Sequence, residues 1–198
     1  MIPPFNASSV LPPFIGDAPG LHATMSPYRT DLLTFVRRFA TTGQRAILLA
    51  GLLDYRAALG RAGVASGFQW IDGSFVEHVE VIRGRPPADI DLVTFSPAPE
   101  MGKYATDTEF EEWVAKFSEL FDPEQARTTY GCHAFFIDTM KRPELLIDDT
   151  RYWFGVFSHQ TATALWKGMI QIPMDSNDAE ARVYLAQLSF NVEEANHA

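Results

Sequence analysis

Apolar and polar residues repeat along the chain with two periods, one typical of helices and one typical of strands. Segments in which apolar residues recur every three or four positions predict helices that bury one face. Ser26 followed by Pro27 indicates the start of the first helix, because serine caps helices and proline fits the first helical position. The helices predicted in this way cover residues 28–43, 44–63, 106–121, 143–160 and 178–190.

Between these segments lie short runs that are rich in β-branched and aromatic residues and are bounded by glycine or proline. Such runs are typical of strands. The strands predicted in this way cover residues 68–72, 89–95, 128–138 and 168–174. Helices and strands in this order predict an α/β domain of the α+β type, in which a small mixed sheet is flanked by helices.

We expect residues 1–198 to form a single domain with four consecutive parts. The first part carries five prolines, which predict an extended arm, and its residues Phe5, Phe14 and Ile15 indicate that the arm lies on the domain. The parts are the proline-rich arm (1–25), a helical pair (26–64), the core with the candidate site (67–175), and a C-terminal helix and tail (176–198).

Composition and charge narrow the classes of function. The 198 residues are 46% hydrophobic and carry a formal net charge of −9, which disfavours binding to a nucleic-acid backbone. Cys132 is the only cysteine, so neither an intrachain disulfide nor a zinc ribbon is expected. The N-terminus lacks the pattern of a secretory leader, and no apolar run is long enough to span a membrane. We therefore expect a cytoplasmic protein with no membrane partner.

Asp89 and Asp91 open the strand "DIDLVTF" and are the first candidate site residues. Residues two apart in a strand point to the same face, so the two carboxylates project together. Such a pair repels itself unless a cation lies between its members, and Mg²⁺ prefers hard oxygen ligands. The alternative is structural: Asp89 caps a turn after Pro86-Pro87, and Asp91 is a solvated residue of an edge strand.

Gly73-Ser74 follows the predicted strand "FQWID" and is the second candidate. A glycine-serine turn exposes backbone N–H groups and a hydroxyl, which together suit an anion such as a phosphate. We expect the turn and the Asp pair to face one pocket.

These motifs resemble the polymerase-beta-like nucleotidyltransferase superfamily, whose signature is Gly-Ser followed by Asp-apolar-Asp-apolar. Here the signature reads Asp72-Gly73-Ser74, then fourteen residues, then Asp89-Ile90-Asp91-Leu92, an interval slightly longer than is usual. More closely, "GFQWIDGSFVE", "PADIDLVTF" and "LWKGMIQI" look like a bacterial nucleotidyltransferase-like family of unknown function. That likeness extends over about residues 1–175.

The resemblance implies Mg²⁺ or Mn²⁺ ions held by Asp89, Asp91 and a third carboxylate on a later strand. Asp138, at the end of "CHAFFID", is the best positional match, with a polar strand terminus as the alternative. If the inward face of that strand is instead the face of His133, Asp138 points away, and the site holds two carboxylates and an imidazole.

For the triphosphate of the substrate, Ser74 is the expected hydroxyl contact, assisted by the backbone of Gly73 and Ser74. Lys167 in "LWKG" is a candidate phosphate ligand, because a lysine can reach a phosphate as a point charge. The alternative is a solvated lysine at the start of a strand. Cys132-His133 and Ser158-His159 are adjacent pairs, and neither is expected to form a nucleophile–base pair if extended.

The sequence therefore leads to two hypotheses. In the first, the chain is an Mg²⁺-dependent nucleotidyltransferase that moves a nucleoside monophosphate from a nucleoside triphosphate (NTP) to a hydroxyl or phosphate acceptor, with a small molecule or protein favoured over nucleic acid. In the second, it is a non-catalytic module of the same fold that binds a nucleotide or a protein, for instance in a toxin–antitoxin or phage-defence pair. The aromatic segment 151–157 fits a core position or a contact in a homo-oligomer.

Overall fold

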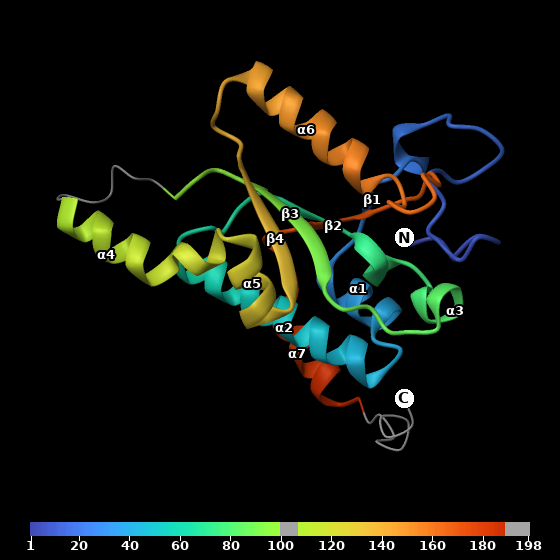
Figure 1. Cartoon of the computed structure of the whole chain (residues 1–198), viewed down its shortest axis with the longest axis horizontal. Helices are drawn as coiled ribbons and strands as arrows, with labels where there is room; N and C mark the ends of the chain where they lie inside the picture. Colours follow the sequence, from blue (N-terminus) through green and yellow to red (C-terminus); the bar gives the residue numbers. More distant parts are fainter. Residues whose placement is uncertain (100–106, 189–198) are drawn as a thin grey trace.

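A five-stranded mixed sheet forms the centre of the computed structural model, which describes residues 1–99 and 107–188 (Figure 1). The strands lie in the order β1-β5-β2-β3-β4. β2 is antiparallel to β3 and β5, whereas β3 and β4 are parallel, as are β1 and β5. The predicted α+β class is confirmed. The strands are β1 (Tyr28–Arg29), β2 (Phe68–Asp72), β3 (Ile90–Ser96), β4 (Cys132–Asp138) and β5 (Ile170–Pro173).

One face of the sheet packs on the main hydrophobic core. Ile71, Leu92 and Ala134, on three neighbouring strands, lie in one cluster with buried leucines of the long helix α2. Because side chains alternate along a strand, these residues project together and exclude water from that face. The helices of this layer are α1 (Leu32–Phe39), α2 (Gly43–Arg61), α5 (Pro123–Tyr130) and α7 (Asp178–Ala186).

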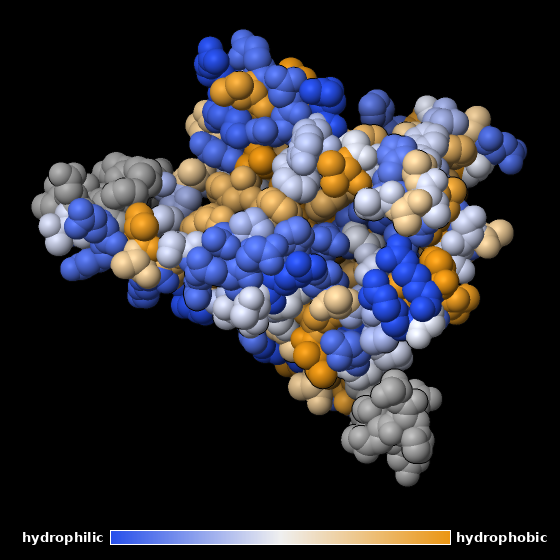
Figure 2. Space-filling view, in the orientation of Figure 1, coloured by the Kyte–Doolittle hydropathy of each residue, from blue (hydrophilic) through white to orange (hydrophobic). Residues whose placement is uncertain are grey.

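The opposite face of the sheet is covered by α6 (Pro143–Phe157). Trp70, Val93 and Phe95 project from β2 and β3 into a second cluster, where they meet Trp153 and Phe157 of this helix. The space-filling view shows a light orange apolar band below α6 and above the blue hydrophilic surface of α5 (Figure 2). The two clusters make the sheet apolar on both faces over most of its length.

Short elements connect these layers. The turn after β2 forms a 3₁₀ helix and leads into α3, while α4 and a further 3₁₀ turn precede α5. Their bounds are η1 (His22–Thr24), η2 (Gly73–Val76), α3 (Val79–Arg83), α4 (Asp107–Phe117) and η4 (Ser118–Leu120). Thr106, the predicted first residue of α4, and residues 189–198 of the predicted C-terminal helix and tail lie outside the described residues. None of the described helices is both long and apolar enough to cross a membrane.

Two element predictions were wrong at their boundaries. The helix expected to start after Ser26 begins only at Leu32, where the Asp31 carboxylate accepts a hydrogen bond from the Thr34 N–H at 2.8 Å. The residues before it pair as β1 with β5, because Tyr28 is buried and its hydroxyl bonds the Pro12 carbonyl. Tertiary packing therefore overrides the serine–proline signal.

Residues 128–130 were predicted as strand but form the last turn of α5. The Asp122 carboxylate caps that helix by accepting hydrogen bonds from the N–H groups of Glu124 and Gln125. Gly131 ends the helix at φ 66°, a left-handed conformation that glycine adopts at low cost. β4 begins directly after it.

The N-terminal arm lies on the domain. Val10 and Leu11 are fully buried, and Leu11 belongs to the main core cluster. The Leu11 carbonyl accepts a hydrogen bond from the Gly168 N–H at 2.8 Å, just before β5. The arm therefore contributes apolar contacts and a backbone bond close to Lys167.

Candidate functional site

Three polar side chains form a row across β2, β3 and β4. Asp72 ends β2 and stands opposite Asp91 of β3, which stands opposite His133 of β4. Residues directly opposite each other in a sheet project to the same face. Here it is the face on which Trp70, two residues before Asp72, packs against α6.

Gly73 and Ser74 follow this row directly, and together with Asp91 they line a pocket of about 360 Å³. We call it the Asp91 pocket. Its further polar residues are Asp72, Glu77, Arg83, His159, Gln160, Thr161 and Lys167. The turn and the Asp pair were predicted to face one pocket. This agrees with the placement of Gly73, Ser74 and Asp91, but it is corrected for Asp89, which does not line the pocket.

The Asp91 carboxylate lies against the backbone of Gly73. A Cβ atom added at Gly73 would stand 1.9 Å from Asp91 Oδ2, far inside the van der Waals limit, and Gly73 has φ 73°. Only glycine meets both requirements without strain. The absence of a side chain at Gly73 thus lets the carboxylate approach the turn that was predicted to bind an anion.

Asp91 also pairs with His133, whose Nδ1 lies 3.0 Å from Asp91 Oδ1. The Asp91 side chain is 30% exposed, so it can reach a ligand in the pocket. Burial raises the pKa of the Asp91 carboxyl, and the nearby Asp89 carboxylate adds to this, whereas the hydrogen bond from His133 lowers it. A cation close to Asp91 would relieve the remaining repulsion.

Asp89 precedes β3, and its carboxylate is turned toward α5. Arg127 Nε donates a 2.6 Å hydrogen bond to Asp89 Oδ2, and Arg127 Nη2 approaches the same oxygen. Asp89 is not among the residues that line the Asp91 pocket. The two aspartates therefore lie close enough to interact electrostatically, but Asp89 is paired with Arg127 and Asp91 with His133.

Lys167 is in the Asp91 pocket, as predicted, but its contacts differ from the prediction. Its ammonium group lies 2.7 Å from Asp72 Oδ1, 3.2 Å from the Gly73 carbonyl and 3.3 Å from Glu77 Oε1. An ammonium group has three protons, so these contacts account for all its donors. We correct the predicted role: Lys167, which is 2% exposed, holds the glycine-serine turn and is not free to bind phosphate.

Two buried carboxylates share this one ammonium group. Burial raises the pKa of Asp72 to about 7, although Lys167 opposes the shift. The second carboxylate, Glu77, also accepts a 2.8 Å hydrogen bond from the side-chain amide of Gln160. The turn is thus fixed by a fully bonded buried network.

Asp138 does not join the Asp pair, and its predicted role as third ligand is corrected. It stands opposite Ser96 at the far end of β3 and β4, whereas His133 stands opposite Asp91. Asp138 lies five positions after His133, about 16 Å along the strand. Asp138 Oδ1 accepts hydrogen bonds from the N–H groups of Ala98 and Met140, which is the structural role of a strand terminus.

The family of the chain follows from a comparison with known protein families. Residues 3–173 match the model of DUF6932, a family of unknown function. The chain belongs to this family. The matched region runs from the N-terminal arm to the end of β5 and contains every residue of the Asp91 pocket, whereas α7 lies beyond it. No curated protein and no solved structure matches the chain significantly.

The resemblance implies a divalent metal, and the side chains around Asp91 decide whether the chain can bind one. Among residues 1–99 and 107–188, no group of three or more His, Cys, Asp and Glu side chains is arranged to hold a metal ion. The Asp91 side chain, which is 30% exposed, borders the predicted anion turn. Mg²⁺ is commonly bound through one or two carboxylates together with substrate phosphates. The site therefore offers one carboxylate, Asp91, to a metal that arrives with a phosphate ligand, because Asp89 is bound by Arg127 outside the pocket.

Several residues of the site were missed from the sequence. Asp72 directly precedes Gly73 in the motif, and this position could have marked it as a site residue. Its burial could not have been predicted, because burial depends on the tertiary structure. Glu77 and Gln160 carry no short-range signal, since they bond each other although they are 83 residues apart in the chain. Ser158 is the C-terminal cap of α6, whereas His159 forms an isolated antiparallel β-bridge with Trp166. Ser158 Oγ lies 3.1 Å from His159 Nδ1.

Proposed function

We propose that the Asp91 pocket binds the triphosphate of an NTP with Mg²⁺ or Mn²⁺, and that the chain is a nucleotidyltransferase. The observation that carries the proposal is the contact of the Asp91 carboxylate with the backbone of Gly73. It places a metal-binding oxygen beside a turn suited to phosphate. The order of the two motifs along the chain, Gly-Ser and then Asp-Ile-Asp, supports the same assignment.

Each residue of the pocket has a role in this proposal. The Ser74 hydroxyl and the backbone N–H groups of the turn contact phosphate oxygens. Asp91 would hold the divalent cation that neutralises the triphosphate, and Asp89 would join it on releasing Arg127. His133 orients the Asp91 carboxylate through their 3.0 Å contact, and Lys167 fixes the turn. Catalysis comes mainly from positioning and charge neutralisation.

The reaction is an in-line displacement at the α-phosphorus of the NTP. An oxygen of the acceptor hydroxyl or phosphate forms a bond to that phosphorus, and the bond to the leaving pyrophosphate breaks. A hydroxyl acceptor loses its proton to solvent or to a nearby base. The products are the nucleotidylated acceptor and pyrophosphate.

The acceptor is a small molecule or a protein rather than a nucleic acid in this proposal. A net charge of −9 repels a polyanionic acceptor, while the pocket itself admits a triphosphate through a metal. We place the reaction in the cytoplasm, and the free, buried Cys132 is compatible with a reducing compartment.

The proposal is tested with Asp91→Asn, which keeps the side-chain shape and removes the charge. We expect pyrophosphate release from an NTP with Mg²⁺ to fall on the order of 100-fold or more, since a metal ligand is lost. The matched control is Asp148→Asn, which removes an exposed carboxylate of α6 whose side chain is 70% accessible. Equal rates in the two variants, with unchanged circular dichroism, would refute the assignment.

A second candidate function is a module that binds an NTP without transferring it. It is favoured by His133, which occupies the position on β4 where the resemblance implies a third carboxylate. Both candidates predict that an NTP with Mg²⁺ stabilises the chain, by about 2.7 kcal/mol at 100 times Kd. Stabilisation in a thermal-shift assay without any pyrophosphate release, across a panel of acceptors, would select the binding module.

A further inference from the structure

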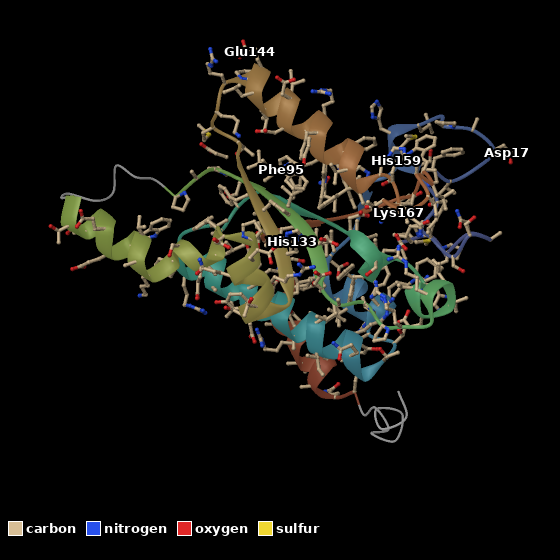
Figure 3. The ribbon with its side chains drawn as sticks, in the orientation of Figure 1. Asp17, Phe95, His133, Glu144, His159 and Lys167 are labelled. Carbon is tan, nitrogen blue, oxygen red and sulfur yellow. The ribbon has the colours of Figure 1, made fainter. Side chains whose placement is uncertain are left out.

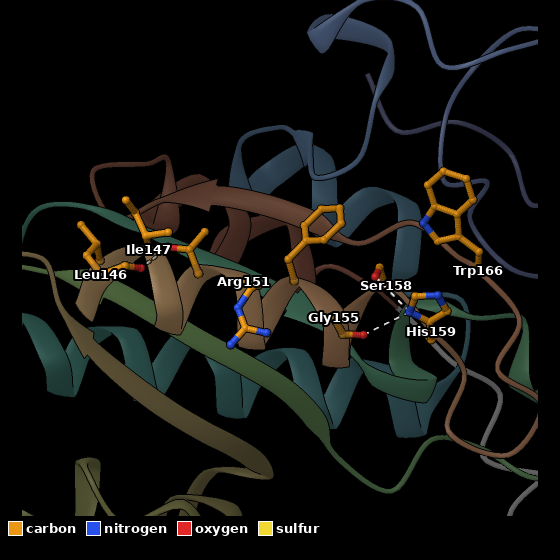
Figure 4. Close-up of a pocket in the computed structure, with 9 residues that line it drawn as sticks. Leu146, Ile147, Arg151, Gly155, Ser158, His159 and Trp166 are labelled. Atoms are coloured by element: carbon orange, nitrogen blue, oxygen red, sulfur yellow. Dashed lines mark hydrogen bonds between the residues drawn. The ribbon is translucent and has the colours of Figure 1, made fainter. Parts of the chain in front are cut away.

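An apolar groove runs along the outer side of α6, and we call it the α6 groove (Figure 4). Its volume is about 680 Å³, roughly the size of a small-molecule site. Leu146, Ile147, Phe154 and Trp166 supply most of its apolar wall. Trp166 is 39% exposed, and its indole ring also contacts the ring of Phe14 at a centroid distance of 5.7 Å.

The α6 groove meets the Asp91 pocket at His159, which lines both. The last turn of α6 is shared in the same way: Gly155 lines the groove, and Phe157 lines the pocket. Beyond it, Trp166 belongs to the groove and the next residue, Lys167, to the pocket. Figure 3 shows His159 and Lys167 near the same end of α6, with Glu144 at the other end. One extended ligand can therefore occupy both sites.

The His159 ring presents a hydrogen-bond acceptor at this junction. Its Nδ1 lies 3.1 Å from the Gly155 carbonyl, which can only accept, and 3.1 Å from Ser158 Oγ, so this contact favours the tautomer with its proton on Nδ1. Nε2 then carries a lone pair, and within the described part of the chain it makes no hydrogen bond. An N–H group of a ligand can donate to it.

Gly155 leaves the floor of the groove open. A Cβ atom built there meets no heavy atom within 4 Å, and the residue lies in the exposed last part of α6. A planar ring can therefore lie over Gly155 and stack on Trp166 without any rearrangement of the helix. Aromatic side chains stack nucleobases with little dependence on their sequence.

We infer that the α6 groove holds the purine base of the NTP whose phosphates bind in the Asp91 pocket. The inference rests on the proposed function and adds the position and class of the base. The ribose spans the junction, an amino or ring N–H of the base donates to His159 Nε2, and the larger purine ring system stacks better on Trp166 than a pyrimidine does.

The test compares four Mg²⁺-loaded probes, ATP, GTP, UTP and inorganic tripolyphosphate, by isothermal titration calorimetry. In the unmodified chain, ATP or GTP binds about tenfold or more tightly than tripolyphosphate, because only the NTP has a base to stack. Gly155→Leu fills the groove with a residue of higher helix propensity, so the fold is kept. It lowers ATP and GTP affinity about tenfold or more and leaves tripolyphosphate affinity unchanged.

The matched control is Tyr152→Leu, which places the same side chain on the same helix, 59% exposed and outside the groove. It leaves the affinities for all four probes unchanged. Trp166→Ala, as a second variant, lowers purine affinity like Gly155→Leu. If Gly155→Leu binds ATP and GTP as tightly as the unmodified chain does, the inference is overturned, while the proposed function stays in place. Failure of all four probes to bind the unmodified chain would overturn both.

If the α6 groove instead contacts a second copy of the chain, Gly155→Leu changes the oligomeric state. The sedimentation coefficient would then shift from that of a dimer to that of a monomer, and the ATP affinity would stay unchanged. That outcome would also overturn the inference.

Discussion

Gly73 is the residue on which the geometry of the Asp91 pocket depends most directly. Gly73→Ala places a methyl group 1.9 Å from Asp91 Oδ2 at a left-handed φ, so the turn or the carboxylate must move. We expect a loss of about 1–3 kcal/mol in the free energy of unfolding, measured with urea, together with loss of NTP binding.

Gly60→Ala is the matched control, because a Cβ atom at Gly60 in α2 meets no heavy atom within 4 Å. It should be neutral or stabilising by up to about 1 kcal/mol, and equal destabilisation by both variants would contradict the argument.

Asp72 gives the pocket a defined pH dependence. Its folded-state pKa of about 7 lies above its ordinary value of 3.8, so the folded chain holds this proton more tightly than the unfolded chain does. The resulting stabilisation is complete below pH 3.8 and is lost as the pH rises toward 7, at up to about 1.4 kcal/mol per pH unit.

Asp72→Asn removes this titration. We expect the difference in unfolding free energy between the unmodified chain and Asp72→Asn to fall from pH 4 to pH 7 and to level off above it. Urea unfolding at a series of pH values measures this difference. A difference that does not change over that range would show that Asp72 titrates at its ordinary pKa.

The shared pocket of Gly73-Ser74 and Asp91 could be predicted from the two motifs, although their contact depends on the register of β2 against β3. A two-residue strand period projects Asp91 to one face, and glycine followed by serine marks a turn. The residue of β4 that stands beside Asp91 could not be predicted, since it depends on the register of β4 against β3. Asp91 and His133 are 42 residues apart, and no local pattern fixes which residue of β4 stands opposite.

At the scale of elements, Arg56 joins α2 to α7 and to two strands of the sheet. Its guanidinium is buried and bonds the Asp178 carboxylate, the Gln69 side chain and the carbonyls of Pro173 and Met174. Arg56→Met leaves the buried acceptors unpaired, and we expect a loss of about 3–5 kcal/mol in unfolding free energy.

The control for this prediction is a surface arginine on the same pair of helices. Arg182 of α7 lies 2.8 Å from Asp54 of α2, with both side chains about half exposed. Arg182→Met should cost less than about 1 kcal/mol, because exposed ion pairs contribute little. Denaturant titration of both variants gives the comparison, and similar losses would mean that burial does not govern the effect.

The elements with strong periodicity were predictable, whereas the short ones depended on their neighbours. α2 and α6 follow from repeated apolar positions over several turns. β1 is two residues long and exists because β5 offers it an unpaired edge, which a local pattern cannot reveal. α5 was missed although Asp122-Pro123 is a good start signal, because its buried face is narrow and only Ala126 is fully covered.

At the scale of the whole molecule, the N-terminal arm is part of the core. Leu11→Ala removes a fully buried side chain, and we expect a loss of about 2–5 kcal/mol in unfolding free energy. Leu21→Ala changes the same residue type in the same arm at 70% exposure and should change stability by less than about 0.5 kcal/mol. Differential scanning calorimetry of the two variants measures this. Equal melting temperatures would mean that the arm is dispensable.

The buried contact of Lys167 with Asp72 and Glu77 also sets an order of events during synthesis. Lys167 follows Asp72 by 95 residues, so the ribosome makes the two acids long before their counter-ion. A nascent chain that stops short of β5 also leaves one edge of β2 unpaired. The pair of β2 and β3 therefore reaches its final form only when the last strand emerges, and until then water hydrates the two acids in place of Lys167.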